Sequence, residues 1–135
     1  MINDVRLLKA LADENRLRLL LLLRQKELFV CQLMAVTGIS QSLVSRSLTL
    51  LEREGLVASR REGKHVFYHL NESMPAVGHA VVDALARRRQ EGPLFAADRE
   101  NLELFCRRFH GGQACDMSIV NRFIAYKNKK QSQGA

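Results

Sequence analysis

Residues 39–70 read ISQSLVSRSLTLLEREGLVASRREGKHVFYHL, and this stretch predicts a helix that leads directly into a hairpin. Ser40 is a good N-cap for a helix over residues 41–54, and Gly55 is suited to end it. The helix has an apolar face with the i, i+4, i+7 spacing of a side packed on a core, formed by Val44, Leu48 and Leu51. The stretch therefore predicts one amphipathic helix with a defined start and end.

The polar face of this helix is rich in short side chains that donate and accept hydrogen bonds. It comprises Ser40, Gln41, Ser42, Ser45, Arg46 and Thr49. Glutamine and arginine can pair with base edges in the major groove of DNA, and hydroxyl groups can reach phosphates or bases. A solvent-exposed amphipathic helix has the same composition, so the helix alone leaves both interpretations open.

The hairpin that follows favours the DNA-binding interpretation. Two extended runs, 56–60 and 65–70, are joined across residues 61–64, where Gly63 can adopt a positive φ. The hairpin carries three long cationic side chains, Arg60, Arg61 and Lys64. Such side chains can contact the phosphate backbone beside a helix that lies in a groove. A helix followed by a basic hairpin predicts a winged helix-turn-helix that binds double-stranded DNA.

The segment before this stretch predicts three short helices. An apolar stripe marks the first, through Val5, Leu8, Leu11 and Ala12. Asp13 can cap a second helix that runs to about Arg24 and is hydrophobic nearly all round, as expected of a buried central helix. A third helix over residues 30–36 completes the helix-turn-helix.

Three further helices are expected after the hairpin. Asn71 or Ser73 can open the first of them, which continues the apolar periodicity beyond the wing. Asp98 can cap the second. The last is expected to be short, around Phe123, and the polar tail over residues 127–135 is expected to fray.

Together these elements predict a mainly α fold with a small β-hairpin wing. Residues 1–92 are expected to form a DNA-binding and dimerisation domain, and residues 93–135 a C-terminal helical extension. The first helix and the helix after the wing have apolar faces with little core to cover them, so we expect a homodimer through N-terminal and C-terminal helices. A two-fold axis would place two recognition helices about 34–36 Å apart, one turn of DNA, which suits a palindromic operator.

The composition favours a chain with one core and an anionic partner. The 135 residues are 47% hydrophobic, enough to bury a core, and the net charge of +7 favours nucleic acid as the partner. The longest apolar run is too short to span a bilayer, and the chain does not open with a secretory pattern, so we expect a cytoplasmic protein without membrane contact. The sequence has no glycine-rich phosphate loop and no nucleophile elbow, so an enzyme is not expected.

Several blocks of the sequence resemble the ArsR/SmtB family of bacterial metal- and metalloid-responsive repressors. They are LKALAD at 8–13, NRLR at 15–18, ISQSLVSRSL at 39–48, LEREGLV at 51–57 and RREGKHVFYHL at 60–70. The resemblance is close over roughly the first seventy residues and looser afterwards. It implies a homodimeric winged helix that represses by occupying an operator and leaves it when an inducer binds.

The resemblance directs attention to the segment before the recognition helix. Arsenic-responsive members of the family carry Cys-Val-Cys there, with a third Cys three residues later. In this chain Phe29 stands at the first of these positions, Cys31 at the second and Met34 at the third. Two of the three sulfur ligands are therefore absent, and this segment alone cannot form the arsenic site of the family.

The remaining cysteines of the chain, Cys106 and Cys115, are expected to complete a site with Cys31. Three thiolates suit a soft ion. The family resemblance implies arsenite or antimonite, As(III) or Sb(III), as the inducer. The chain is therefore expected to be a repressor that a thiophilic effector releases from its operator.

Other interpretations of these residues remain open. Cys31 can be a small buried core residue. Cys106 and Cys115 can form a disulfide, which would make the chain a thiol-redox-sensing repressor. Zinc is a less favoured effector, with candidate ligands Cys106, His110, Cys115 and Asp116. Where zinc-sensing relatives carry paired ligands on the helix after the wing, this chain has only His79 and Asp83. A winged domain that binds a protein in place of DNA is a further rival.

Overall fold

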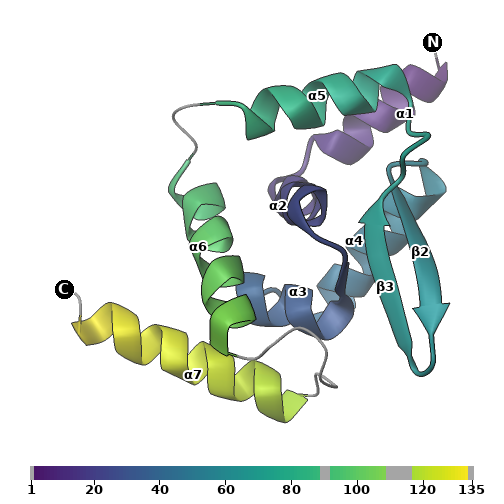
Figure 1. The fold of residues 1–135 in the computed structure, drawn as a ribbon. Helices are drawn as coiled ribbons and strands as arrows, with labels where there is room; N and C mark the ends of the chain where they lie inside the picture. The colour runs from purple at the N-terminus through teal and green to yellow at the C-terminus, as the bar shows by residue number, and fades with distance from the viewer. Residues whose placement is uncertain (1, 89–91, 109–116, 134–135) are drawn as a thin grey trace.

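The computed structural model describes residues 2–88, 92–108 and 117–133, and these form a helical body with a small sheet at one side (Figure 1). The elements are α1 (Ile2–Leu11), α2 (Glu14–Gln25), β1 (Leu28–Phe29), α3 (Val30–Thr37), α4 (Gln41–Arg53), β2 (Val57–Glu62), β3 (His65–Leu70), α5 (Ala76–Ala86), α6 (Pro93–Arg108) and α7 (Met117–Gln133). The predicted mainly α fold with a hairpin wing is confirmed.

Helix α2 lies at the centre of the molecule, with α1 and α5 on one side and α6 on another (Figure 1). The Asp13 side chain caps it by accepting a hydrogen bond from the backbone N of Arg16 at 3.0 Å. Four of its leucines are buried: Leu19, Leu20, Leu22 and Leu23. The prediction of a buried central helix is thus confirmed.

The helix-turn-helix consists of α3 and α4. A turn joins them at Gly38, whose φ of 76° is the left-handed conformation that favours glycine. Ser40 caps α4, since its side chain accepts from the backbone N of Leu43 at 3.3 Å. The apolar face of α4 is completely buried, through Val44, Leu48 and Leu51.

The wing is an antiparallel hairpin in which β2 pairs with β3. Its register sets Val57 opposite Leu70 and Glu62 opposite His65, so a tight turn at Gly63, with φ of 61°, closes it. The strand β2 therefore runs two residues further than predicted. A third strand, β1, pairs with the outer side of β3. The sequence did not indicate β1, because two residues are too few to show alternation.

The starts of α5 and α6 differ from prediction. Pro75 occupies the N-cap position of α5, while Asn71 is used elsewhere: its Nδ2 donates to the carbonyl of Gly55 at 2.9 Å. Helix α6 begins at Pro93, and Asp98 lies buried inside it. Proline fits the first turn of a helix because the missing N–H has no partner there anyway. The predicted capping roles of Asn71, Ser73 and Asp98 are therefore wrong.

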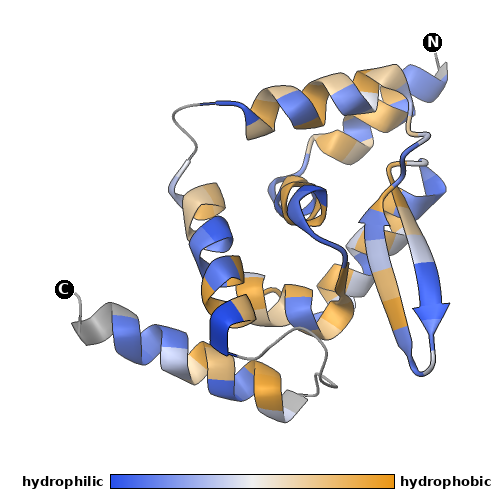
Figure 2. Cartoon of the chain, viewed as in Figure 1, coloured by the Kyte–Doolittle hydropathy of each residue, from blue (hydrophilic) through white to orange (hydrophobic). Residues whose placement is uncertain are grey.

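Helix α7 is longer than predicted and extends to Gln133, over residues that were expected to fray. Its first half packs on the body through Val120 and Phe123, which are both buried. The ring of Phe123 meets that of Phe105 edge to face, with centroids 5.2 Å apart. This contact with α6 anchors a helix whose second half is hydrophilic (Figure 2).

Only part of the apolar stripe of α1 packs against the core. Leu11 packs into the core as predicted, but Val5 and Leu8 are 44% and 47% exposed. Val77, on the neighbouring helix α5, is also exposed, at 38%. In a single chain, α1 and α5 therefore leave apolar surface uncovered. None of the described helices is long and apolar enough to cross a membrane.

Candidate nucleic-acid interface

The polar residues predicted to read DNA lie together on the first three turns of α4. All six are exposed: Ser40, Gln41, Ser42, Ser45, Arg46 and Thr49. Two of them also bond to the helix backbone, since Arg46 Nε donates to the Ser42 carbonyl at 3.3 Å and Thr49 Oγ1 donates to the Ser45 carbonyl at 2.9 Å. The buried opposite face holds the helix so that these side chains face solvent.

A shallow groove beside α4 adds two arginines that were not predicted. Ser45, Arg46 and Thr49 line it together with Arg16 at the start of α2 and Arg53 at the end of α4. The position of Arg53 could have been found, because it follows Thr49 by one helical turn. Arg16 could not, because its place depends on how α2 packs against α4.

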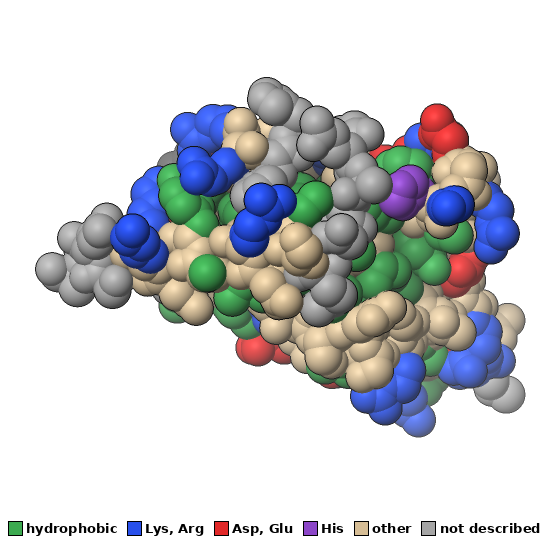
Figure 3. Space-filling model, turned by 90° about the horizontal axis from the view of Figure 1, so that it is seen from below, with side chains coloured by type: hydrophobic (Ala, Val, Ile, Leu, Met, Phe, Trp, Pro, Cys, Tyr) green, Lys and Arg blue, Asp and Glu red, His purple; other side chains and the backbone are tan. Residues whose placement is uncertain are grey.

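The three cations of the wing differ in their surroundings. Arg60 bonds to the carboxylates of Glu27 and Glu62, and its guanidinium lies 4.6 Å from the centroid of the Phe67 ring. The hydrogen bond from Arg60 holds the pKa of Glu27 below its usual value. Arg61 and Lys64 are exposed near the tip. Figure 3 shows Lys and Arg side chains gathered at the wing on the right and over α7 on the left.

The described cysteines lie on two helices that pack together. Cys31 is on α3 and Cys106 on α6, and both are partly buried against the core. Lys26 Nζ lies 3.5 Å from the sulfur of Cys106. Cys115, His110 and Asp116 lie outside the described residues. Within the described ranges, no three His, Cys, Asp or Glu residues are grouped closely enough to hold a metal ion.

The residues at the family's other effector positions have structural contacts. Phe29, where arsenic-responsive members have a cysteine, is buried and stacks on His65 with ring centroids 4.9 Å apart. On α5, His79 Nε2 lies 3.3 Å from the Glu72 carbonyl, whereas Asp83 accepts a hydrogen bond from Arg24 at 3.2 Å. His79 and Asp83 therefore each interact with a different neighbour.

Comparison with known proteins identifies the family of the chain. Residues 13–59 match the model of the bacterial regulatory protein family called arsR. The arsenical resistance operon repressor of Escherichia coli strain K12 is 42% identical over 88 residues, which are 64% of this chain and 75% of that protein. The chain belongs to the ArsR family. The predicted family is confirmed, and so is the expectation that the chain is not an enzyme, because these relatives are transcriptional regulators.

Two solved structures share the fold of this chain, and a further relative is similar to it in sequence. HlyU from Vibrio cholerae, solved in its reduced form, has a TM-score of 0.57 and 40% identity, covering 64% of this chain and 87% of its own. A homodimeric winged helix-turn-helix DNA-binding domain, Mb0332 from Mycobacterium bovis, has a TM-score of 0.56 and 35% identity, covering 66% and 82%. A SmtB homologue of Synechocystis is 45% identical over 64 residues, 47% of this chain and 48% of its own.

Proposed function

We propose that this ArsR-family repressor binds a palindromic operator as a homodimer and releases it when arsenite or antimonite binds its cysteine thiolates. The observation that carries the DNA-binding part is the exposed polar face of α4. It starts at a side-chain cap, rests on a fully buried apolar face and leads directly into a basic wing. Base edges and phosphates are the groups that these two surfaces suit.

Gln41, Ser42, Ser45 and Arg46 are proposed to enter the major groove, with Ser40 and Thr49 beside them. Arg60, Arg61 and Lys64 are proposed to contact phosphates. Before Arg60 can do so, its guanidinium has to exchange the carboxylates of Glu27 and Glu62 for a phosphate. Arg61 and Lys64 are the more direct phosphate contacts, because they are exposed close to the turn.

The proposed effector site rests on the chemistry and position of the cysteines. Cys31 stands in the first turn of α3, and α3 leads through Gly38 into α4. Cys106 stands on α6, which packs against α3. Thiolates are the ligands that a soft, three-coordinate ion prefers. Together with Cys115, these residues would hold the metalloid, and a change in how α3 packs would be passed to the recognition helix.

The family relatives support the same proposal. The matched proteins include arsenical resistance regulators from Escherichia coli and Pseudomonas putida, as well as SmtB homologues. In this chain, Phe29 replaces a cysteine of the usual arsenic motif and is part of the core. The sulfur ligands therefore have to come from α3 and from the C-terminal extension together.

The test is a titration of the reduced protein on operator DNA with arsenite, antimonite, zinc and an oxidant in turn. Fluorescence anisotropy would follow the wild type and the variants Cys31→Ser, Cys106→Ser and Cys115→Ser. We expect arsenite to release wild-type protein, and each variant to bind DNA normally but stay bound with arsenite present. An unaltered response of Cys31→Ser would exclude the three-thiolate site.

The other titrants separate the rival effectors. Loss of DNA binding on oxidation, reversed by dithiothreitol and dependent on Cys106 and Cys115, would favour the redox-sensing alternative. Release by zinc but not by arsenite would favour a zinc sensor. Binding that did not weaken with salt would contradict the DNA-binding proposal itself, because phosphate contacts release counterions.

A further inference from the structure

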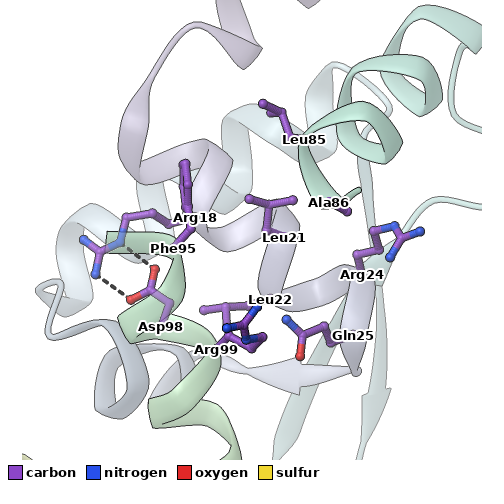
Figure 4. Close-up of a pocket in the computed structure, with 10 residues that line it drawn as sticks. All are labelled: Arg18, Leu21, Leu22, Arg24, Gln25, Leu85, Ala86, Phe95, Asp98 and Arg99. Atoms are coloured by element: carbon purple, nitrogen blue, oxygen red, sulfur yellow. Dashed lines mark hydrogen bonds and ion pairs between the residues drawn. The ribbon is translucent and has the colours of Figure 1, made fainter. Parts of the chain in front are cut away.

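A buried ion pair connects the C-terminal extension to the helix-turn-helix. Arg18 of α2 and Asp98 of α6 are 8% and 3% exposed, and 80 residues of chain separate them. Arg18 Nε donates to Asp98 Oδ2 at 2.8 Å, and Nη2 donates to Oδ1 at 2.9 Å (Figure 4). This bidentate geometry is the one that fixes a guanidinium in one orientation.

The same guanidinium also holds the end of α3. Arg18 Nη2 donates to the carbonyl of Thr37, the last residue of α3, at 2.9 Å. From α6, Asn101 Nδ2 lies 3.5 Å from the carbonyl of Val36. The last carbonyls of a helix have no hydrogen-bond donor within the helix, and here side chains of α2 and α6 donate to two of them. The very next residue is Gly38, the turn before the recognition helix.

We propose that Asp98 is a positioning residue for the recognition helix, acting through Arg18 and the Thr37 carbonyl. This inference rests on the proposed DNA-binding function. Asp98 holds the arginine, the arginine holds the end of α3, and the end of α3 sets where α4 begins. The C-terminal extension is therefore part of the unit that reads DNA.

The surroundings of the pair explain why loss of the Asp98 carboxylate would break the hydrogen bond between Arg18 and the Thr37 carbonyl. On one side a cavity of about 180 Å³ lies between α2, α5 and α6, and both Arg18 and Asp98 line it (Figure 4). The charge of the half-buried Lys127 of α7 also interacts with the pair, attracted by Asp98 and repelled by Arg18. Without the carboxylate, the buried guanidinium would be left without its counter-ion. The guanidinium would then turn into the cavity and leave the Thr37 carbonyl.

The test compares binding to two duplexes: one selected from a random library by the wild-type protein, and a scrambled version of it. The readout is the dissociation constant for the scrambled duplex divided by that for the selected duplex, both measured at one salt concentration. We expect Asp98→Asn to lower this ratio by about tenfold or more, with scrambled-duplex binding retained, since phosphate contacts carry no sequence information. Asp83→Asn, which breaks the exposed pair with Arg24, is the matched control and should leave the ratio unchanged.

A double variant, Arg18→Leu with Asp98→Leu, separates positioning from stability. It removes both buried charges, so the thermal stability is expected to recover relative to Asp98→Asn. The ratio should stay low, because the Thr37 carbonyl still has no donor. If the ratio recovers together with stability, or if Asp98→Asn weakens both duplexes equally, the pair has only a structural role and the inference is overturned.

The wild-type measurement distinguishes failure of this inference from failure of the proposed function. If the wild type shows no preference for any selected duplex, sequence-specific DNA binding is itself contradicted. If the wild type does show a preference and Asp98→Asn keeps it, only the positioning role of Asp98 is contradicted. If Asp98→Asn does not fold, the double variant alone decides.

Discussion

At the scale of single residues, α4 and the wing present two kinds of polar side chain. Gln41 and Ser45 are short and lie on a helix that is held by a buried face. Arg61 and Lys64 are long and lie near a hairpin turn. Side chains held on a helix in the groove suit base edges, whereas long cations on a hairpin beside the groove suit phosphates whatever the sequence.

The two kinds are expected to respond differently to substitution. Arg61→Gln or Lys64→Gln should weaken binding to every duplex and reduce the salt slope by about one per residue. Gln41→Ala should instead remove about 1–3 kcal/mol of discrimination at one base pair. Salt-dependent anisotropy on a set of operator variants measures both effects.

The control for lost charge is Arg24→Gln, a cation of α2 that pairs with Asp83 away from α4 and the wing. It should change neither the slope nor the discrimination. Equal losses on every operator variant for Gln41→Ala would contradict its assignment to a base edge.

The residues whose roles could be predicted from the sequence are those whose partners lie close to them along the chain. Ser40 was recognisable as a cap because the backbone N that it accepts from is three residues away. Asp98 has the same capping chemistry, but its partner Arg18 is 80 residues distant, and only the fold brings the two together. Its predicted place at a helix start was therefore wrong.

At the scale of elements, the wing is tied to the segment that enters the helix-turn-helix. Glu27 precedes β1 and accepts hydrogen bonds from Arg60 of β2, across β3, which lies between the two strands. The contact fixes the base of the wing relative to the start of α3. It also occupies one of the three wing cations, because Arg60 has to leave the carboxylates of Glu27 and Glu62 before it can contact a phosphate.

This contact predicts a pH dependence of stability. Because pairing lowers the pKa of Glu27 in the folded state, the carboxylate stabilises the fold above its unfolded pKa, and the effect is lost as the pH falls through the folded pKa. Glu27→Gln should therefore have a lower melting temperature than the wild type at pH 7, and the difference should shrink below about pH 4.

Thermal unfolding followed by circular dichroism at several pH values measures this difference. Glu72→Gln, a substitution at an exposed glutamate, serves as the control. A difference between wild type and Glu27→Gln that stayed constant down to pH 3 would contradict the pairing.

Elements were predictable where their signals are local and long enough to show a period. Helix α4 combines a cap, an apolar face and a terminating glycine within fifteen residues or so, and its predicted bounds agree with the structure to about one residue. Strand β1 is two residues long and exists only because β3 is beside it. The second half of α7 is hydrophilic, so its helical state depends on the anchor at Phe123 more than on its own pattern.

At the scale of the whole molecule, α1 and α5 carry the surface that a second copy would cover. Val5, Leu8 and Val77 are exposed on two helices that lie side by side (Figure 1). Burial of apolar surface contributes about 25 cal/mol per Å². A relative of this chain was solved as a homodimer, which agrees with such pairing.

Leu8→Glu is therefore expected to convert the protein to a monomer, because it would bury a carboxylate in an apolar interface. Sedimentation velocity would measure the change in mass. Binding to a two-site operator should fall far more than binding to a single half-site. Ala125→Glu, at an exposed position of α7, should stay dimeric. A Leu8→Glu variant that also stays dimeric would show that the two-fold contact lies elsewhere.

The hydrogen bond between Arg18 and the Thr37 carbonyl has a consequence for engineering. A sensor built by joining the winged segment to the tail of another ArsR-family regulator would carry Arg18 without its carboxylate wherever that tail has no acidic residue at the position of Asp98. Such a chimera needs an acidic residue at the position of Asp98, because an uncharged residue at position 18 would leave the Thr37 carbonyl without its donor. Exchange of parts between these regulators is thus limited by a pair whose members lie on opposite sides of the joining point.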